Sequence, residues 1–177
     1  PYWTYPSGQF SQVFEDSSYR ILKNTKAYPH AFLAGSYQVA HGQEILQTMF
    51  DKKIDLLRSV VLEQNPALAI RNDPKAISKI VSYKADKITI TTQAKTNMLL
   101  FLSDSYYPGW KAYIDGKEMP ILRADYAFRA IPVPKGVHTV IFAYKPLSFA
   151  LGLIGAIVGL VSLVGVSFFV KKGYFQN

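Results

Sequence analysis

The stretch FALGLIGAIVGLVSLVGVSFFV occupies residues 149–170 and contains no charged side chain. At about 1.5 Å per residue, a helix of this length is about 33 Å long, which matches the hydrocarbon thickness of a bilayer. A buried helix of a globular protein shows a polar stripe at a spacing of about 3.6 residues, whereas this region offers only Ser148, Ser162 and Ser167. We therefore predict a transmembrane helix over residues 147–170.

The charges beside this helix predict its orientation. Two lysines follow it directly, and no acidic residue occurs after Asp125. Because positively charged flanks stay on the cytoplasmic side, we expect residues 171–177 to be a cytoplasmic tail and residues 1–146 to be extracytoplasmic. The chain starts at Pro1 rather than Met, so we expect it to be a fragment, the C-terminal end of a longer protein.

The composition allows one folded domain outside the membrane. The 177 residues leave enough chain, after the helix and its tail, for a domain with a hydrophobic core. Leaving out the two lysines after the helix lowers the net charge from +8 to +6, which suits a membrane surface or another anionic envelope partner. Scattered lysines are also typical of an ordinary solvated surface. We expect no nucleic-acid partner outside a membrane, and the absence of cysteine excludes disulfides.

Short runs rich in Val, Ile, Thr and aromatic residues predict a mainly β fold for the outer region. Two isoleucines alternate with threonines in residues 87–92, as in a sheet with one buried face. Asp115-Gly116 predicts a two-residue hairpin turn, because a type I′ turn needs positive φ at both positions. Many short strands separated by turn signals indicate a β-sandwich or jelly-roll-like domain. The predicted strands are residues 19–24, 31–39, 59–62, 78–83, 87–92, 97–103, 126–133 and 137–144.

One short amphipathic helix is predicted over residues 42–50, where the apolar side chains follow a helical period. The chain before it is aromatic and turn-rich but shows no period as far as Ser17, so we predict a loop or linker from an upstream membrane region. The predicted organisation is a linker over residues 1–18, an extracytoplasmic β-sandwich domain over 19–146, a transmembrane helix over 147–170 and a tail over 171–177.

An aromatic cluster before and within one predicted strand is a candidate sugar-contact surface. It consists of Tyr106, Tyr107, Trp110 and Tyr113. The apolar C–H face of a pyranose packs on aromatic rings while its hydroxyls bind polar neighbours. The strand alternation favours a different interpretation, in which Trp110 points into the core and the two tyrosines before it brace a turn.

The remaining polar residues give no catalytic or metal motif. Four carboxylates, those of Asp104, Asp115, Glu118 and Asp125, lie close in sequence, as an acid/base pair requires, but three of them are explained by turns. The three histidines show no metal-ligand spacing. We therefore assign no catalytic residue, no metal site and no cofactor to this chain.

Small residues in the apolar helix predict close packing against another helix. Gly155 and Gly159 form a Gly-x-x-x-Gly pair, and Gly152 with Ala156 adds a second pair. Such residues let helix backbones approach each other closely in a membrane. The expected partners are upstream transmembrane helices of the same polypeptide, together with membrane lipid.

Several segments resemble the C-terminal region of the YfhO family of bacterial multi-pass membrane proteins. The most specific are the Tyr-Tyr-Pro-Gly-Trp block and the closing Tyr-Lys-Pro-Leu-Ser-Phe that runs into the terminal helix. The segments that carry the resemblance are residues 19–24, Pro29, residues 31–33, 103–116, 123–138 and 142–149.

This resemblance implies an integral glycosyltransferase of the cell membrane. Such proteins take sugar from a polyprenyl-phosphate carrier and add it to an anionic envelope polymer such as lipoteichoic acid. The family places its acidic catalytic residues in an outer loop near the N-terminus, which this chain does not include. The alternative is a non-enzymatic, membrane-anchored module that binds carbohydrate or cell wall.

Overall fold

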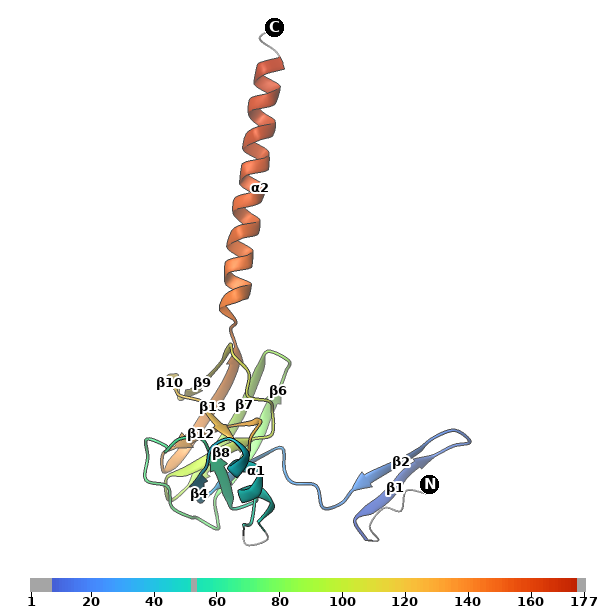
Figure 1. Ribbon diagram of the computed structural model, residues 1–177, viewed down its shortest axis with the longest axis vertical. Helices are drawn as coiled ribbons and strands as arrows, with labels where there is room; N and C mark the ends of the chain where they lie inside the picture. Colours follow the sequence, from blue (N-terminus) through green and yellow to red (C-terminus); the bar gives the residue numbers. More distant parts are fainter. Residues whose placement is uncertain (1–7, 52–53, 175–177) are drawn as a thin grey trace. The chain divides into compact units, whose positions relative to one another are not determined.

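The computed structural model describes residues 8–51 and 54–174, with side chains described as far as Gly165 (Figure 1). Contacts divide the chain into two units, residues 1–30 and residues 31–177. The first residues of the predicted linker, 1–7, and the last residues of the predicted tail, 175–177, lie outside the described residues.

One sheet of the larger unit contains five antiparallel strands. They are β6 (Ile77–Tyr83), β7 (Lys87–Ala94), β9 (Trp110–Ile114), β10 (Lys117–Met119) and β13 (Gly136–Tyr144). Their spatial order is β10-β9-β13-β7-β6. The turn between β9 and β10 has positive φ at Asp115 (49°) and Gly116 (86°), which confirms the predicted two-residue hairpin.

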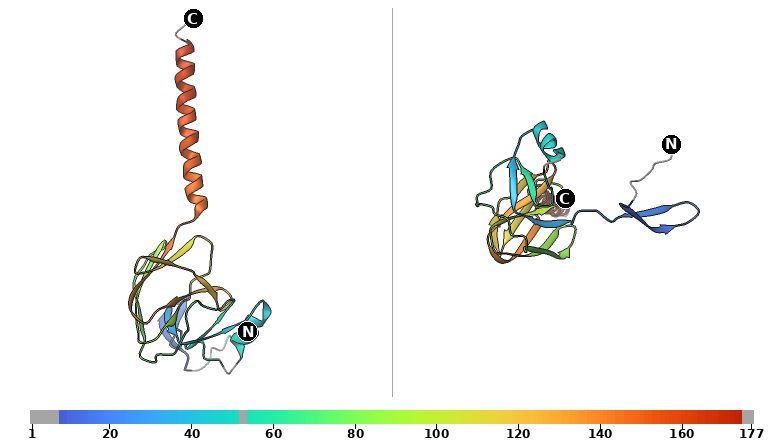
Figure 2. Two further views of the ribbon diagram at one scale, coloured as in Figure 1. Left: turned by 90° about the vertical axis from the view of Figure 1, so that its left-hand side faces the viewer. Right: turned by 90° about the horizontal axis from the view of Figure 1, so that it is seen from below.

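The second sheet contains six strands in the order β3-β8-β12-β11-β5-β4. They are β3 (Ala31–Ala34), β4 (Ser36–Val39), β5 (Ser59–Leu62), β8 (Met98–Leu102), β11 (Leu122–Ala124) and β12 (Phe128–Val133). The helix α1 (Gln43–Phe50) connects β4 to the segment before β5 and buries Ile45. The predicted mainly β fold with one short helix before the C-terminal helix is therefore confirmed (Figure 2).

The two sheets pack against each other through one hydrophobic cluster. The five-stranded sheet contributes Ile88, Ile90, Ala112, Ile114, Val140 and Phe142, and the six-stranded sheet contributes Ala31, Leu100, Leu102, Ile131 and Val133. Alternate residues of β8, such as Leu99 and Phe101, belong to a second cluster on the other face. The six-stranded sheet is thus buried on both faces, which explains the continuous apolar sequence of β8.

The six-stranded sheet curls on itself at Gly35. Its two edge strands, β3 and β4, lie at opposite ends of the strand order although only Gly35 separates them in sequence. The sheet must therefore bend until these edges meet. The second cluster draws side chains from β3, β5, β8, β11 and β12, with Tyr37 of β4 packed against it, so it fills the concave side. The predicted single strand over residues 31–39 is consequently divided in two.

Gly35 allows a close approach of the chain that any side chain would block. A Cβ atom added there would lie 2.4 Å from Asn72 Cα and 2.5 Å from Asn72 Oδ1. We expect Gly35→Ala to lower the free energy of unfolding by about 1–3 kcal/mol, because either β3 or the segment around Asn72 must shift. Denaturant titration of the full chain in detergent micelles measures this loss. Gly152→Ala is the control, since its added Cβ meets no atom within 4 Å; equal midpoints for the two variants would contradict the prediction.

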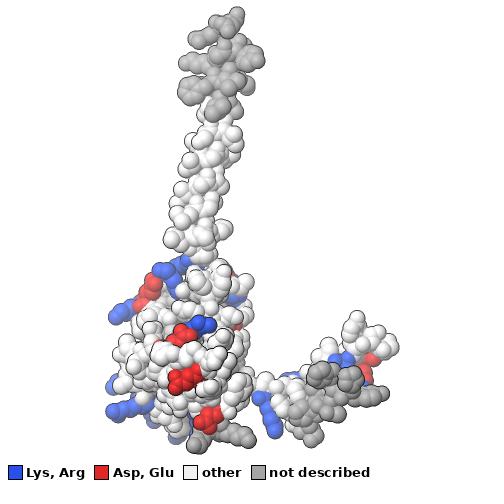
Figure 3. Space-filling view, in the orientation of Figure 1, with Lys and Arg blue, Asp and Glu red and all other residues white. Residues whose placement is uncertain are grey.

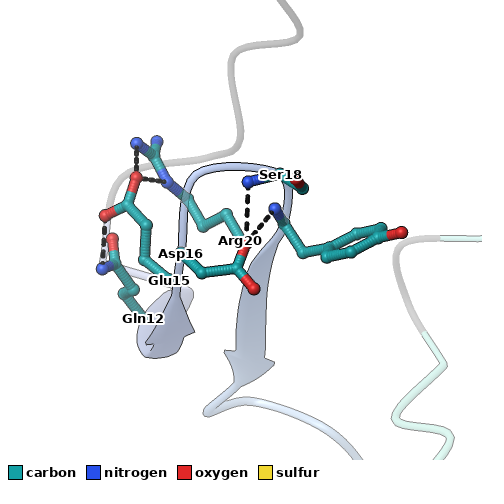
Figure 4. Close-up of polar contacts among 6 residues, drawn as sticks. Gln12, Glu15, Asp16, Ser18 and Arg20 are labelled. Carbon is teal, nitrogen blue, oxygen red and sulfur yellow. Dashed lines mark hydrogen bonds and ion pairs between the residues drawn. The ribbon is translucent and has the colours of Figure 1, made fainter.

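The smaller unit contains a β-hairpin of β1 (Phe10–Glu15) and β2 (Arg20–Asn24). Asp16 Oδ1 accepts hydrogen bonds of 2.7 Å from the backbone N–H groups of Ser18 and Tyr19, which closes the turn (Figure 4). Glu15 accepts hydrogen bonds from Arg20 Nε at 2.9 Å and from Gln12 Nε2 at 2.7 Å. Irregular chain was expected here, but pairing with β2 makes Phe10–Glu15 a strand, and a register shift between Gln12 and Phe14 obscures its alternation.

The C-terminal helix α2 (Leu147–Tyr174) contains a segment that could span a membrane. Residues Leu147–Gly165 have a mean hydropathy of 2.5, and none of that segment is buried. Its side chains appear uniformly uncharged in Figure 3 as far as the described part extends. The hydroxyl of Ser162 donates a 2.8 Å hydrogen bond to the carbonyl of Val158, so this polar group is satisfied within the helix.

Candidate functional site

A pocket of about 310 Å³ opens beside the loop that precedes β9. One wall is aromatic and contains Tyr106, Tyr107 and Trp110. Further lining residues come from β10 and the chain after it, including Glu118, Met119 and Ile121, and Arg129 of β12 also contributes. We call this the aromatic pocket.

The loop that carries the aromatic wall is fixed at both ends. The backbone N–H of Tyr106 donates to the carbonyl of Ala127 at 2.6 Å, and the carbonyl of Gly109 accepts from the N–H of Lys145 at 2.6 Å. Gly109 has φ of 98°, and a Cβ there would lie 2.9 Å from the Tyr144 ring. Only glycine fits this position easily, so the chain that leads into α2 lies directly against the loop.

One lining residue of the pocket, Arg129, forms a partly buried ion pair with Asp104. Arg129 is only 2% exposed, and its Nη2 donates a 2.8 Å hydrogen bond to Asp104 Oδ2. The hydroxyl of Tyr83 donates to the other oxygen of Asp104 at 2.8 Å, and this bond raises the pKa of Tyr83. Two strands from the five-stranded and six-stranded sheets are thereby connected through one carboxylate.

Arg129 also lies against aromatic rings. Its guanidinium carbon is 4.1 Å from the centroid of the Trp110 ring and 5.5 Å from that of Phe142. Burial lowers the pKa of Arg129, although Asp104 opposes this effect. Among the described residues, its Nε and Nη1 atoms have no hydrogen-bond partner. Unsatisfied buried donors of this kind favour binding of a water molecule or a ligand oxygen.

The structure brings three of the four predicted sugar-contact residues together. Tyr106, Tyr107 and Trp110 line the aromatic pocket, and the two tyrosines are 44% and 63% exposed. Trp110 is half-buried against the sandwich core and lies 5.4 Å from the Tyr144 ring. Tyr113 lies elsewhere, with its ring 5.2 Å from the Lys145 ammonium. A role in sugar contact stays a prediction for all four.

Each of the four neighbouring carboxylates has a structural partner. Besides the Asp104 pair, Glu118 binds Lys111 at 3.0 Å on the surface. Asp115 binds His138 Nδ1 at 2.6 Å and accepts from the backbone N–H of Thr139 at 2.8 Å. This contact lowers the pKa of Asp115 and raises the pKa of His138. These contacts hold turns and strand ends together.

Asp125 differs from the other carboxylates because it is almost fully buried, at 5% exposure. It has φ of 45°, and its Oδ1 accepts a 2.7 Å hydrogen bond from the N–H of Val61. The Asp125 N–H in turn donates to the Val61 carbonyl at 2.8 Å. Burial raises the pKa of Asp125 to about 6. The side chain therefore joins the turn after β11 to β5.

The predicted helix-packing residues lie on one face of α2. Gly152, Gly155, Ala156 and Gly159 follow the spacing of one helical face, and an added Cβ at any of the three glycines would meet no atom within 4 Å. This face is open in the described part of the chain, and its partner stays a prediction.

Part of the chain, including this site, is similar to a known protein family. The family described as "Bacterial membrane protein YfhO" matches residues 69–155, from the chain before β6 to the first turns of α2. That range contains the whole aromatic pocket. This part of the chain is similar to the YfhO family.

The chain is also similar to the uncharacterized protein YfhO of Bacillus subtilis (strain 168). It is 29% identical over 123 residues, which cover 66% of this chain and 14% of that protein. The chain thus corresponds to a small part of its relative's length. No solved structure matches the chain.

Arg129 lines the aromatic pocket but was not among the site residues predicted from the sequence. One signal was available, because Arg129 is a charged residue between apolar neighbours in a predicted strand. Such a residue is buried only with a partner. The identity of that partner was not available from sequence, since Asp104 lies 25 positions away and on no recognisable spacing.

Proposed function

We propose that this chain is the C-terminal accessory domain and last membrane span of a YfhO-like integral membrane glycosyltransferase. The parent protein would transfer sugar from a polyprenyl-phosphate carrier to an envelope polymer such as lipoteichoic acid. In this proposal residues 1–146 are extracytoplasmic, the C-terminus is cytoplasmic, and the catalytic residues belong to the upstream part of the parent. The domain binds sugar and positions the acceptor.

The aromatic pocket is the observation that carries this proposal. Its loop binds the chain at Lys145, just before α2 begins at Leu147. A pocket held there lies next to the membrane, where the sugar of a lipid-linked donor is presented. Exposed tyrosine rings offer the apolar faces on which a pyranose packs.

The charges of the pocket favour an uncharged sugar. Lys111 is paired with Glu118, and Arg129 is paired with Asp104, so neither cation is uncompensated. The pocket therefore offers hydrogen-bond donors and aromatic faces without a net charge, which suits a neutral hexose better than a phosphate group.

Tyr107→Ala tests this role, because Tyr107 is 63% exposed and its loss spares the core. We expect roughly two- to tenfold weaker binding of neutral oligosaccharides to the full chain in detergent, followed by Trp fluorescence, since one aromatic contact is lost. We also expect slower transfer of labelled sugar to lipoteichoic acid in membranes that contain the parent protein. The matched control is Tyr28→Ala, an exposed tyrosine of the smaller unit.

Sugar binding by the pocket and sugar transfer by the parent protein can be tested separately. Unchanged oligosaccharide binding in Tyr107→Ala would refute the sugar-binding role of the pocket. Normal binding by the unaltered chain without any transfer by the parent protein would refute the glycosyltransferase assignment and favour an anchored binding module.

The glycine face of α2 supports a further part of the proposal, namely packing against upstream spans of the same polypeptide. Replacing Gly155 and Gly159 together with Ile is expected to reduce correct assembly of the parent protein, because the helices can no longer approach closely. Protease resistance of the parent in membranes measures assembly. Equal resistance of variant and unaltered protein would exclude this face as the contact.

A further inference from the structure

The outer face of the five-stranded sheet gathers lysines at the end nearest α2. Ala143 of β13 pairs with Lys87 of β7 on one side and with Lys111 of β9 on the other. Residues directly opposite each other in antiparallel strands share a face, and the next residue along each strand is buried in the sandwich core. Lys87 and Lys111 therefore project from the outer face. Lys145 joins them, because its ammonium lies over the ring of Tyr113 on that face.

A second pocket lies beside these lysines. It has a volume of about 600 Å³ and a cationic side formed by Lys111 and Lys145. Its apolar side comes from the start of α2, where Leu147 and Phe149 are more than 70% exposed. We call this the junction pocket. A site with cations on one side and apolar side chains on the other fits an amphiphile.

The covalent chain keeps the junction pocket beside the first turns of α2, the helix that could span a membrane. Only Lys145 and Pro146 separate the end of β13 from the start of α2. This connection spans at most about 10 Å, so a bilayer that α2 spans would have its headgroups beside the pocket. At a bilayer surface, lipid is the ligand present at the highest concentration beside the junction pocket.

The charges around the junction pocket favour an anion. Four lysines lie at this end of the sheet, Lys84, Lys87, Lys111 and Lys145, against two carboxylates, Asp86 and Glu118. The net charge of these six side chains is +2. Glu118 forms an ion pair with Lys111, with a distance of 3.0 Å between Oε1 and Nζ. Figure 3 shows basic and acidic side chains side by side where α2 begins.

We infer that the junction pocket binds an anionic phospholipid of the leaflet in which α2 begins. The phosphate lies against Lys145, Lys87 and the Glu118-paired Lys111 add charge at the rim, and the start of the acyl chains packs on Leu147 and Phe149. The lipid orients the sandwich on the bilayer, which holds the aromatic pocket near the surface. This inference does not depend on the proposed glycosyltransferase activity.

The test compares lipids retained by the full chain in mixed detergent–lipid micelles, measured by native mass spectrometry. The micelles contain phosphatidylcholine with about 30% phosphatidylglycerol, and the variant carries Lys87→Gln, Lys111→Gln and Lys145→Gln. We expect the unaltered chain to retain phosphatidylglycerol preferentially, and the variant to lose at least about tenfold in apparent affinity. About 0.5 M NaCl should weaken the preference of the unaltered chain.

The matched control changes the same number of charges at the far end of the same sheet. Lys75→Gln, Lys95→Gln and Lys135→Gln replace three exposed lysines near the start of β13. We expect this control to retain phosphatidylglycerol within about twofold of the unaltered chain. Equal loss in both triple variants would overturn the inference, since net charge alone would then explain binding. Binding of dextran sulfate through the junction lysines without any preference for phosphatidylglycerol would also overturn it, in favour of a polymer ligand.

Discussion

Asp104→Ala is expected to lower the free energy of unfolding of the sandwich by about 3–5 kcal/mol, because it leaves a buried guanidinium without its counter-charge. Arg129 is 2% exposed and already has two nitrogen atoms without hydrogen-bond partners among the described residues. The substitution also removes the acceptor of the Tyr83 hydroxyl. Denaturant titration of the full chain in detergent micelles measures the effect, with Trp110 as the fluorescent reporter 4.1 Å from the guanidinium carbon.

Two further variants test whether the burial of Arg129 causes this loss of stability. Glu118→Ala breaks the exposed contact with Lys111, where the side chains are 54% and 45% exposed, and should cost no more than about 1 kcal/mol. Arg129→Met in the Asp104→Ala background should recover most of the lost stability, because an apolar side chain of similar length replaces the uncompensated charge. If Asp104→Ala and Glu118→Ala unfold at the same denaturant concentration, the ion pair does not stabilise the fold.

The free energy of unfolding of the sandwich is expected to fall as the pH rises from 3.8 toward 6, because Asp125 loses its proton in this range. Its pKa is 3.8 in its ordinary state and about 6 in the folded chain, so within this window the folded form holds a proton that the unfolded form has released. The raised pKa therefore contributes stability that is fully present below pH 3.8 and is lost as the pH passes the folded value. The contribution of Asp125 to the free energy of unfolding differs by about 3 kcal/mol between pH values below the unfolded pKa and above the folded pKa.

Asp125→Asn should remove this pH dependence. Its amide oxygen can still accept from the Val61 N–H, while the buried charge is absent, so we expect the variant to be about 1–2 kcal/mol more stable near neutral pH. Denaturant titrations from pH 4 to about pH 7.5 provide the comparison. Asp115→Asn is the control of opposite sign, because the lowered pKa of Asp115 contributes stability that is lost as the pH falls. Parallel pH profiles for Asp125→Asn and the unaltered chain would refute the prediction.

Features that depend on neighbouring residues were predictable from the sequence. Alternation in residues 87–92 predicted that Ile88 and Ile90 face the core, and both are at most 1% exposed. The Asp115-Gly116 turn followed from backbone preferences, and the apolar run predicted α2 because its length and lack of charge are local properties. The predicted strands match observed ones to within a few residues, except where residues 31–39 divide at Gly35. Strand β11 was not predicted, and only the turn of the β9–β10 hairpin was.

Features that join distant parts of the chain depend on how the whole chain folds. The contact of Gly35 with Asn72, the pairing of Phe10–Glu15 with β2, and the ion pair of Arg129 with Asp104 all depend on which segments meet. Local sequence encodes dihedral preference and the period of burial, but strand order arises from packing the whole core. The aromatic pocket and the junction pocket therefore appear only when the sheets are assembled beside the start of α2.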